Sequence, residues 1–232
     1  MVARSGISGV TLGMRAGLHP HNRFQAAYDF KALIEAVPEL ARWLVDAPTG
    51  GTTMDFSNPE AVRSLNRALL ASAYGLKHWE FPSDCLCPAV PGRLDYLFHA
   101  AEVMKNANGG KLPHLECLDV GTGASCIYPL LGANEWGWKF LASDIDERSV
   151  RSAERIVEAN PSLRDCIDCR LQVDPMACFS GVVGRGEVID LTVCNPPFYA
   201  HREEADRERL RKQRNLSGSS KGPSNFNGTL SE

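Results

Sequence analysis

The residues Asn195-Pro196-Pro197-Phe198 form the most unusual group in this sequence. Two consecutive prolines cannot continue the hydrogen bonding of a strand, and they hold the backbone rigidly. A side-chain amide and a backbone carbonyl can therefore point at one spot beside an aromatic ring. This grouping suits methyl transfer to a planar amine: the Asn195 and Pro196 oxygens would each accept one amino hydrogen, while Phe198 or Tyr199 stacks on the base.

An amine attached to a purine ring is planar because its lone pair is delocalised into the ring. Acceptors on both amino hydrogens favour a pyramidal nitrogen, which is poised for in-line attack on the methyl group of a sulfonium. No strong base is needed, because the amine proton becomes acidic as methylation proceeds. A strand that simply ends in an Asn-Pro turn is the structural alternative, and the second proline and the aromatic residue argue against it.

A second group that could bind a ligand is the glycine turn around Gly121 and Gly123, directly after an apolar run. Glycines there let a strand turn sharply into a helix and let a ligand approach the backbone. The next apolar run ends at Asp144, about 20 residues further on, where nucleotide-binding α/β folds place a carboxylate that binds ribose hydroxyls. Asp144 is the expected ribose ligand. A plain tight turn for the glycines, and a helix-capping role for Asp144 or Asp146, remain the alternatives.

Four short apolar runs after residue 110 predict the strands that position these groups, within 115–120, 139–143, 167–172 and 191–194. A helical pattern over 149–159 separates the second and third runs, and weaker patterns separate the others. Strands that alternate with helices predict a parallel sheet with right-handed crossovers and a ligand crevice beyond the carboxyl ends of the strands. The unusual residues all follow such ends.

The first hundred residues are predicted to be mostly helical. Apolar residues at helical spacing predict helices within 28–37, 58–76 and 94–104. Asn58 is a plausible N-cap, with Pro59 at the first helical position. A proline-rich connection over 87–93 precedes the third helix, and residues 1–17 are expected to form a flexible arm.

Composition narrows the classes of function. The chain has 232 residues, 44% of them apolar, and a formal net charge of -3. A sizeable core is therefore expected, and any binding of a polyanion must use local basic patches. Two such patches are candidates for RNA binding, one in the arm and one near the end of the chain: His19, His21 and Arg23, and Arg211, Lys212 and Arg214. The second patch is interleaved with acidic residues and is equally compatible with an exposed, salt-bridged helix.

Eight cysteines are scattered through the chain, several of them in the predicted core strands, and no apolar run is long enough for a signal peptide or a membrane span. A reducing, cytoplasmic setting is expected, or a nuclear one if the chain is eukaryotic. Cys166 and Cys169 form a lone CxxC pair. Because zinc needs four ligands at suitable spacing, no metal site is predicted.

Longer stretches of the sequence resemble the adenine-N6 RNA methyltransferases, a family that comprises the bacterial enzyme for 23S ribosomal RNA and eukaryotic relatives acting on U6 and messenger RNA hairpins. The resemblance is spread over almost the whole chain. The stretches that carry it are Gly17-Leu-His-Pro-His-Asn-Arg23, Asp55-Phe-Ser-Asn-Pro-Glu-Ala-Val62, Pro88-Ala-Val-Pro-Gly-Arg-Leu-Asp-Tyr96, Asp119-Val-Gly-Thr-Gly-Ala-Ser-Cys-Ile-Tyr-Pro-Leu-Leu-Gly132 and Asn195-Pro-Pro-Phe198.

The resemblance implies a Rossmann-like class I methyltransferase of the α/β class, with a mostly helical N-terminal extension. It implies S-adenosylmethionine as the cofactor and an RNA substrate, most of all 23S ribosomal RNA, with an unpaired or flipped-out adenosine. Residues 1–105 would form the RNA-binding and cofactor-covering region, and residues 106–232 the methyltransferase domain. The cofactor contacts would be Arg93, Asp119, Gly121, Gly123, Ser125 and Asp144, and the catalytic loop Asn195 to Phe198.

The end of the chain departs from this family pattern. The implied fold has a seven-stranded sheet, whereas only four strands are recognisable, so the C-terminal strands are expected to be missing. This predicts a shortened form of a longer protein, or a partner that completes the sheet, because an uncovered parallel edge invites aggregation. Alternatives to catalysis on ribosomal RNA are a U6 or messenger RNA substrate, a non-catalytic RNA-binding homologue, and methylation of a protein glutamine amide, which is also planar.

Overall fold

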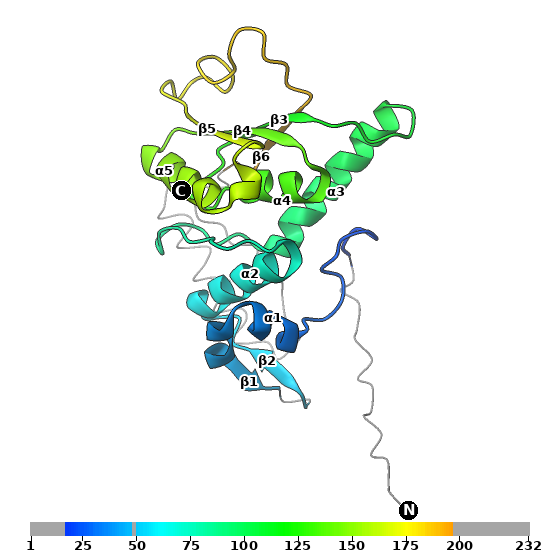
Figure 1. Ribbon diagram of the computed structural model, residues 1–232, viewed down its shortest axis with the longest axis vertical. Coiled ribbons are helices and arrows are strands. Elements are labelled where there is room, and N and C mark those ends of the chain that lie inside the picture. The colour runs from blue at the N-terminus through cyan, green and yellow to red at the C-terminus, as the bar shows by residue number, and fades with distance from the viewer. Residues whose placement is uncertain (1–16, 48–49, 197–232) are drawn as a thin grey trace, which may run out of the picture.

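The computed structural model describes residues 17–47 and 50–196, and a four-stranded parallel sheet forms the centre of its second half (Figure 1). The strands lie in the order β5-β4-β3-β6. Their bounds are β3 (Glu116–Val120), β4 (Lys139–Asp144), β5 (Ile167–Leu171) and β6 (Leu191–Cys194). The four predicted strands and their parallel arrangement are confirmed. Because β4 and β5 lie on one side of β3 and β6 on the other, the strand order reverses at β3, where open α/β sheets form their ligand crevice.

Two helices connect the first three strands and lie on one side of the sheet in Figure 1, α4 (Ile127–Trp136) and α5 (Glu147–Ala159). Asp146 caps α5, because its carboxylate accepts hydrogen bonds from the N–H groups of Arg148 and Ser149, each at 3.1 Å. The predicted capping role of Asp146 is therefore confirmed. The segment between β5 and β6 contains no helix, and Val173 and Met176 within it are exposed.

The N-terminal half is mostly helical, as predicted. It contains α1 (Phe30–Ala36), the 3-10 helix η1 (Pro38–Trp43), α2 (Pro59–Tyr74) and α3 (Val90–Ala107). Asn58 caps α2 by accepting from the N–H groups of Glu60 and Ala61. The short hairpin of β1 (Leu44–Asp46) and β2 (Thr52–Met54) is not predicted, because strands of three residues are too short to show an alternating pattern.

The helix α3 begins earlier than the sequence suggests. Residues 87–93 are predicted to form a connection, yet Val90 and Pro91 already lie in the first turn of α3. Proline is tolerated there, because the first N–H groups of a helix have no acceptor within it. The correction matters for function, since it places Arg93 on a helix instead of a loop.

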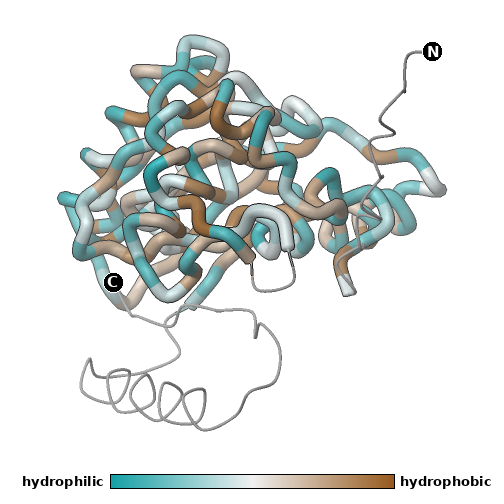
Figure 2. Tube along the Cα trace, turned by 90° about the horizontal axis from the view of Figure 1, so that it is seen from below, coloured by the Kyte–Doolittle hydropathy of each residue, from teal (hydrophilic) through white to brown (hydrophobic). Residues whose placement is uncertain are grey.

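One continuous hydrophobic core joins the two halves of the described chain, and Trp138 and Phe140 are among its largest fully buried side chains. Hydrophobic and hydrophilic stretches alternate along the same trace in Figure 2, as amphipathic elements require. None of the helices within 17–47 and 50–196 combines the length and the apolar character needed to cross a bilayer.

The packing of α4 on β4 gives a prediction about stability. A Cβ atom added at Gly132 would lie 2.5 Å from Cε2 and 2.6 Å from Cζ of Phe140. Since Phe140 is itself buried, we expect Gly132→Ala to lower the free energy of unfolding by roughly 1 to 3 kcal/mol in urea denaturation. Gly92→Ala is the matched control, because nothing lies within 4 Å of its added Cβ. Equal stability of the two variants would contradict this packing.

Candidate active site

The strand register brings three predicted site residues to one edge of the sheet. Val120 at the end of β3 pairs with Ser143 of β4 and with Cys194 of β6. The residues that follow them, Gly121, Asp144 and Asn195, therefore leave three neighbouring strands at the same level. Adjacent strands lie about 5 Å apart, so the three residues span roughly 10 Å.

The glycine turn after β3 is held by the end of β4. The N–H groups of Gly121 and Thr122 both donate to the carbonyl of Ser143 at 2.9 Å. Gly121 and Gly123 have φ angles of +73° and +63°, a conformation that favours glycine. A Cβ added at Gly121 would meet no atom within 4 Å, so the backbone borders open space that a ligand can occupy.

Asp144 organises this edge and is nearly buried, with 8% of its surface exposed. Its Oδ2 accepts from the N–H of Gly123 and its Oδ1 from the N–H of Asp146, both at 2.9 Å. Each carboxylate oxygen can accept a second hydrogen bond. Asp144 can therefore hold the two turns and still bind hydroxyl groups of a ligand, whereas Asp146 serves as the helix cap.

Two of the remaining predicted cofactor contacts, Asp119 and Ser125, lie in the protein interior. Asp119 is a buried residue of β3, and its carbonyl accepts from the Ser143 hydroxyl at 3.2 Å. Ser125 is buried in the turn, and its carbonyl accepts from the indole N–H of Trp79 at 2.8 Å. Trp79 is a site-supporting residue that the sequence patterns did not single out, and it ties the segment before α3 to the glycine turn.

Asn195 is paired with Arg93. The Arg93 Nη1 donates to the Asn195 Oδ1 at 2.6 Å and to the hydroxyl of Tyr128 at 3.0 Å. Burial raises the pKa of Tyr128, and the positive charge of Arg93 offsets part of that rise. The predicted catalytic oxygen of Asn195 thus already accepts a charged hydrogen bond, a contact that no sequence pattern indicated. Pro196 is exposed, and Pro197 and Phe198 lie outside the described residues.

Residues 1–16 of the predicted arm lie outside the described residues, and the part from 17 to 25 packs against the body of the protein. His19 is buried, its ring stacks on Phe98, and its backbone N–H donates to Asp95 at 2.5 Å. Arg23 forms a two-pronged contact with Glu135, with Nε to Oε1 at 2.5 Å and Nη2 to Oε2 at 3.0 Å. Of the three arm residues predicted to bind RNA, His21 and Arg23 are exposed, although Arg23 is paired with Glu135, and His19 is buried. Arg211, Lys212 and Arg214 lie outside the described residues.

The docking of the arm can be tested at Glu135, whose side chain also accepts from the Tyr74 hydroxyl at 2.6 Å. Replacing it with glutamine removes the charge that attracts Arg23 and leaves only one oxygen acceptor. We expect faster hydrogen exchange of the arm amides in Glu135→Gln, measured by mass spectrometry on peptides covering 18–25. Glu158→Gln on α5 is the control, and equal protection in the two variants would show that the ion pair does not hold the arm.

One group of described residues has the composition of a metal site, although the sequence predicts none. The ligand atoms of His19, His99 and Glu102 all lie within 4.8 Å of one another. However, Nδ1 of His19 accepts from the N–H of His21 at 3.2 Å, which places the proton of a neutral ring on Nε2. Nε2 of His19 lies 3.7 Å from Oε2 of Glu102, and Nε2 of His99 lies 3.6 Å from Oδ2 of Asp95, so each imidazole has a carboxylate neighbour within the protein.

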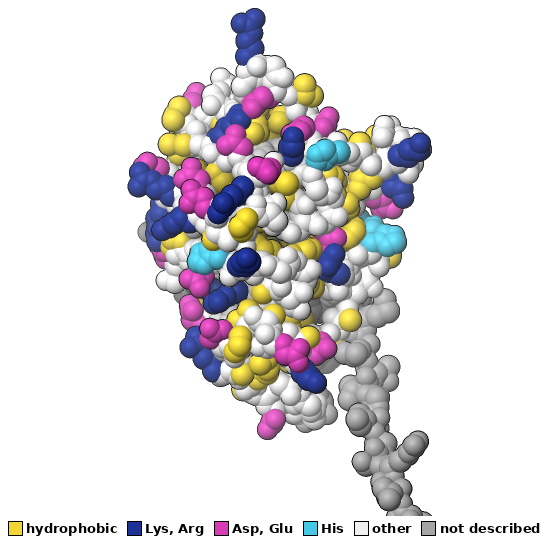
Figure 3. All heavy atoms as spheres, viewed as in Figure 1, with side chains coloured by type: hydrophobic (Ala, Val, Ile, Leu, Met, Phe, Trp, Pro, Cys, Tyr) yellow, Lys and Arg dark blue, Asp and Glu magenta, His cyan; other side chains and the backbone are white. Residues whose placement is uncertain are grey.

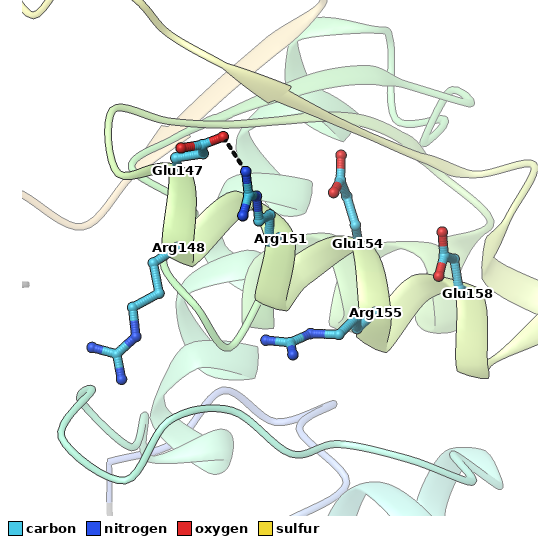
Figure 4. A pocket seen from close by; sticks show the side chains of 6 residues that line it. All are labelled: Glu147, Arg148, Arg151, Glu154, Arg155 and Glu158. Carbon is cyan, nitrogen blue, oxygen red and sulfur yellow. Dashed lines mark hydrogen bonds and ion pairs between the residues drawn. The ribbon is translucent and has the colours of Figure 1, made fainter.

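The surface carries no single-signed patch on the face drawn in Figure 3, where basic and acidic side chains are intermixed. A shallow pocket lies on the outer face of α5, and Figure 4 shows that both arginines and glutamates line it. Arg148 there forms two hydrogen bonds of 2.7 Å with Asp84. None of the predicted site residues lines this pocket. Its lining consists of Glu147, Arg148, Arg151, Glu154, Arg155 and Glu158.

Comparisons with known proteins identify the family of this chain. A family model described as RNA methyltransferase matches residues 13–232. A ribosomal RNA large subunit methyltransferase F from Cronobacter sakazakii is 44% identical over 222 residues, which cover 95% of this chain and 72% of that protein. Bacterial relatives of the same name are 43% to 50% identical, and the chain spans between 61% and 72% of their length.

Two solved structures extend the comparison to a human protein. The N-terminal domain of human METTL16 in complex with SAH has a TM-score of 0.70 and 30% identity, covering 86% of this chain and 79% of that one. The catalytic domain of human METTL16 in complex with a MAT2A 3'UTR hairpin has a TM-score of 0.71 and 33% identity, covering 92% and 69%. The resemblance seen in the sequence is confirmed at the level of the family, and the chain belongs to the RNA methyltransferases.

Proposed function

We propose that this protein transfers a methyl group from S-adenosylmethionine to N6 of an adenosine in RNA, with 23S ribosomal RNA as the substrate. The observation that carries the proposal is the strand register, which sets Gly121, Asp144 and Asn195 side by side at the carboxyl edge of the sheet. A ligand that spans this edge meets, in strand order, the buried Asp144 carboxylate, the open backbone at Gly121 and the Asn195 side-chain amide.

The residues at this edge fit S-adenosylmethionine. Open space beside Gly121 leaves room for a ligand against the backbone, and the Asp144 carboxylate suits the two hydroxyls of a ribose. The Arg93 guanidinium suits the carboxylate of the amino-acid part. When bound, the cofactor would supply a methyl group on a positively charged sulfur. SAH, which is bound by the METTL16 domain of similar structure, is what remains of S-adenosylmethionine after methyl transfer.

Asn195 and Pro196 would act on the amine that receives the methyl group. The Asn195 Oδ1 and the Pro196 carbonyl each accept one amino hydrogen, which draws the nitrogen lone pair out of the ring and orients it. One of these hydrogens leaves as a proton when the new N–C bond forms. Stacking of the base on Phe198 remains a prediction, because Phe198 lies outside the described residues.

Ribosomal RNA is favoured over other RNA by the relatives. The bacterial ribosomal RNA methyltransferases share 43% to 50% identity with the chain, whereas the METTL16 domain bound to a messenger RNA hairpin shares 33%. We place the reaction in the bacterial cytoplasm, where ribosomal RNA resides. The adenosine would be unpaired or flipped out, because a base inside a helix cannot reach the edge of the sheet. His21, exposed on a docked arm, is the arm residue best placed to meet RNA.

The test is transfer of a labelled methyl group to purified 23S RNA, 16S RNA and total protein, all from cells that lack the corresponding gene. Digestion of the RNA to nucleosides then identifies the product. We expect label in N6-methyladenosine from 23S RNA only. Label in protein would support glutamine methylation instead, and label in an added RNA hairpin but not in 23S RNA would move the substrate to the alternative class. No transfer to any acceptor would favour a non-catalytic RNA-binding homologue.

A further inference from the structure

We propose that Arg93 is a positioning residue that fixes the orientation of the Asn195 amide, and that Tyr128 holds Arg93 in place. The inference rests on the proposed function, because it concerns the same site. Arg93 would then have two roles, the expected contact with the cofactor and the orientation of the Asn195 amide. The role of Tyr128 would be to anchor Arg93.

The contact between Arg93 and Asn195 determines which atom of the amide faces the guanidinium. A guanidinium has only hydrogen-bond donors, so the atom of the amide that faces Nη1 at 2.6 Å must be the oxygen. Free rotation would let an asparagine exchange its oxygen and nitrogen ends. The charged hydrogen bond removes that freedom and is of the stronger kind. The oxygen keeps a second lone pair, which is the one that would accept an amino hydrogen of the base.

Arg93 is itself anchored by the hydroxyl of Tyr128. Nη1 carries two hydrogens, and the two acceptors within reach are the Asn195 oxygen and the Tyr128 hydroxyl. Tyr128 lies in the first turn of α4 with only 5% of its surface exposed, so its position is set by the core. This arrangement leaves three of the five N–H donors of Arg93 for a cofactor carboxylate.

The contact between Arg93 and Asn195 affects the methyl-transfer step through the direction of the amide. Asn195 follows the last described strand, and Pro197 and Phe198 of the predicted catalytic loop lie outside the described residues. The direction of its amide is fixed from outside that loop, by one residue of α3 and one of α4. A misdirected amide would present NH₂ instead of oxygen to the amine of the base. Such an error slows the methyl-transfer step and has little effect on the binding of cofactor.

Tyr128→Phe is the most informative variant, because it removes one hydroxyl and leaves the cofactor contacts of Arg93 in place. We expect its kcat to fall by about 10-fold, the equivalent of one hydrogen bond, while its KM for RNA and its Kd for SAH stay within about 2-fold. Arg93→Lys, which replaces the planar guanidinium fork with a single flexible ammonium, should lose more. Arg67→Lys on α2 is the control, since its exposed ion pair with Glu80 lies outside the site. An unchanged kcat in Tyr128→Phe would overturn the proposal.

A second measurement separates this inference from the proposed function. With ¹⁵N-labelled asparagine, the side-chain NH₂ signal of Asn195 is identified by its loss in Asn195→Ala. We expect a rigid amide in the wild-type chain and a mobile one in Tyr128→Phe and Arg93→Lys, and an amide of equal rigidity in all three would overturn the proposal. If the wild-type chain transfers no methyl group, the proposed function fails, and the NMR comparison still decides whether Arg93 and Tyr128 hold the amide.

Discussion

Replacing Asn195 with alanine is expected to lower methyl transfer to RNA by about 10²-fold or more, the loss typical of removing one group that acts in the transition state. The Asn195 Oδ1 accepts from Arg93 and is the acceptor that would draw one amino hydrogen out of the plane of the base. Alanine removes this acceptor and leaves the glycine turn and Asp144 unchanged. The Kd for SAH, measured by calorimetry, should therefore change by no more than about 3-fold, less than one hydrogen bond is worth.

Asn134→Ala is the matched control for this variant. Asn134 lies on α4, where its amide donates to the Leu130 carbonyl at 2.8 Å, away from the carboxyl edge of the sheet. It should retain wild-type turnover. An Asn195→Ala protein that methylates RNA at the wild-type rate would remove Asn195 from the reaction, and a large loss of SAH affinity would assign it to the cofactor instead.

Replacing Asp144 with alanine should have the opposite pattern, with cofactor binding as the first property to fail. Hydrogen bonds to a charged carboxylate contribute about 1.5 to 3 kcal/mol each, so loss of the ribose contact should weaken SAH binding by roughly 10- to 100-fold. The N–H of Gly123 also loses its acceptor, which loosens the glycine turn. Turnover at saturating S-adenosylmethionine should fall much less than the affinity for SAH.

Asp146→Ala separates this effect from local unfolding. Asp146 lies two residues away and caps α5, so its loss should lower the free energy of unfolding by about 1 kcal/mol. Affinity for SAH should persist in this variant. Equal losses of SAH affinity in both variants would mean that the end of β4 acts through stability alone and that Asp144 is not a cofactor ligand.

The strands and the residues at their carboxyl ends could be predicted, because local patterns in the sequence indicate them. The four apolar runs after residue 110 give the strands, and the residues at their carboxyl ends give Gly121, Asp144 and Asn195. Parallel pairing then sets those residues at one edge, although the strand order that makes β4 and β6 both neighbours of β3 is visible only in the structure.

The missed features depend on contacts between segments far apart in the sequence. Arg93 and Asn195 are separated by 102 positions, and no pattern within either segment indicates that they meet. The pairing of Arg23 with Glu135 spans 112 positions, and the sequence alone gives Arg23 only as a candidate for RNA binding. Tyr128 lies within a stretch that resembles the RNA methyltransferases, but the resemblance does not indicate that its partner is Arg93.

The helix α3 gives the arm and the site a common support. The carbonyl of Pro91 accepts from the Asn22 amide at 3.0 Å, and Asp95 accepts from the N–H of His19. Arg93, which donates to the Asn195 amide oxygen, lies between these two anchor points within a single helical turn. A helix is stiff over that distance, so displacing the arm strains the same turn that aims the amide. The arm that is proposed to bind RNA is thus connected through one rigid helix to the atoms that would receive its adenine.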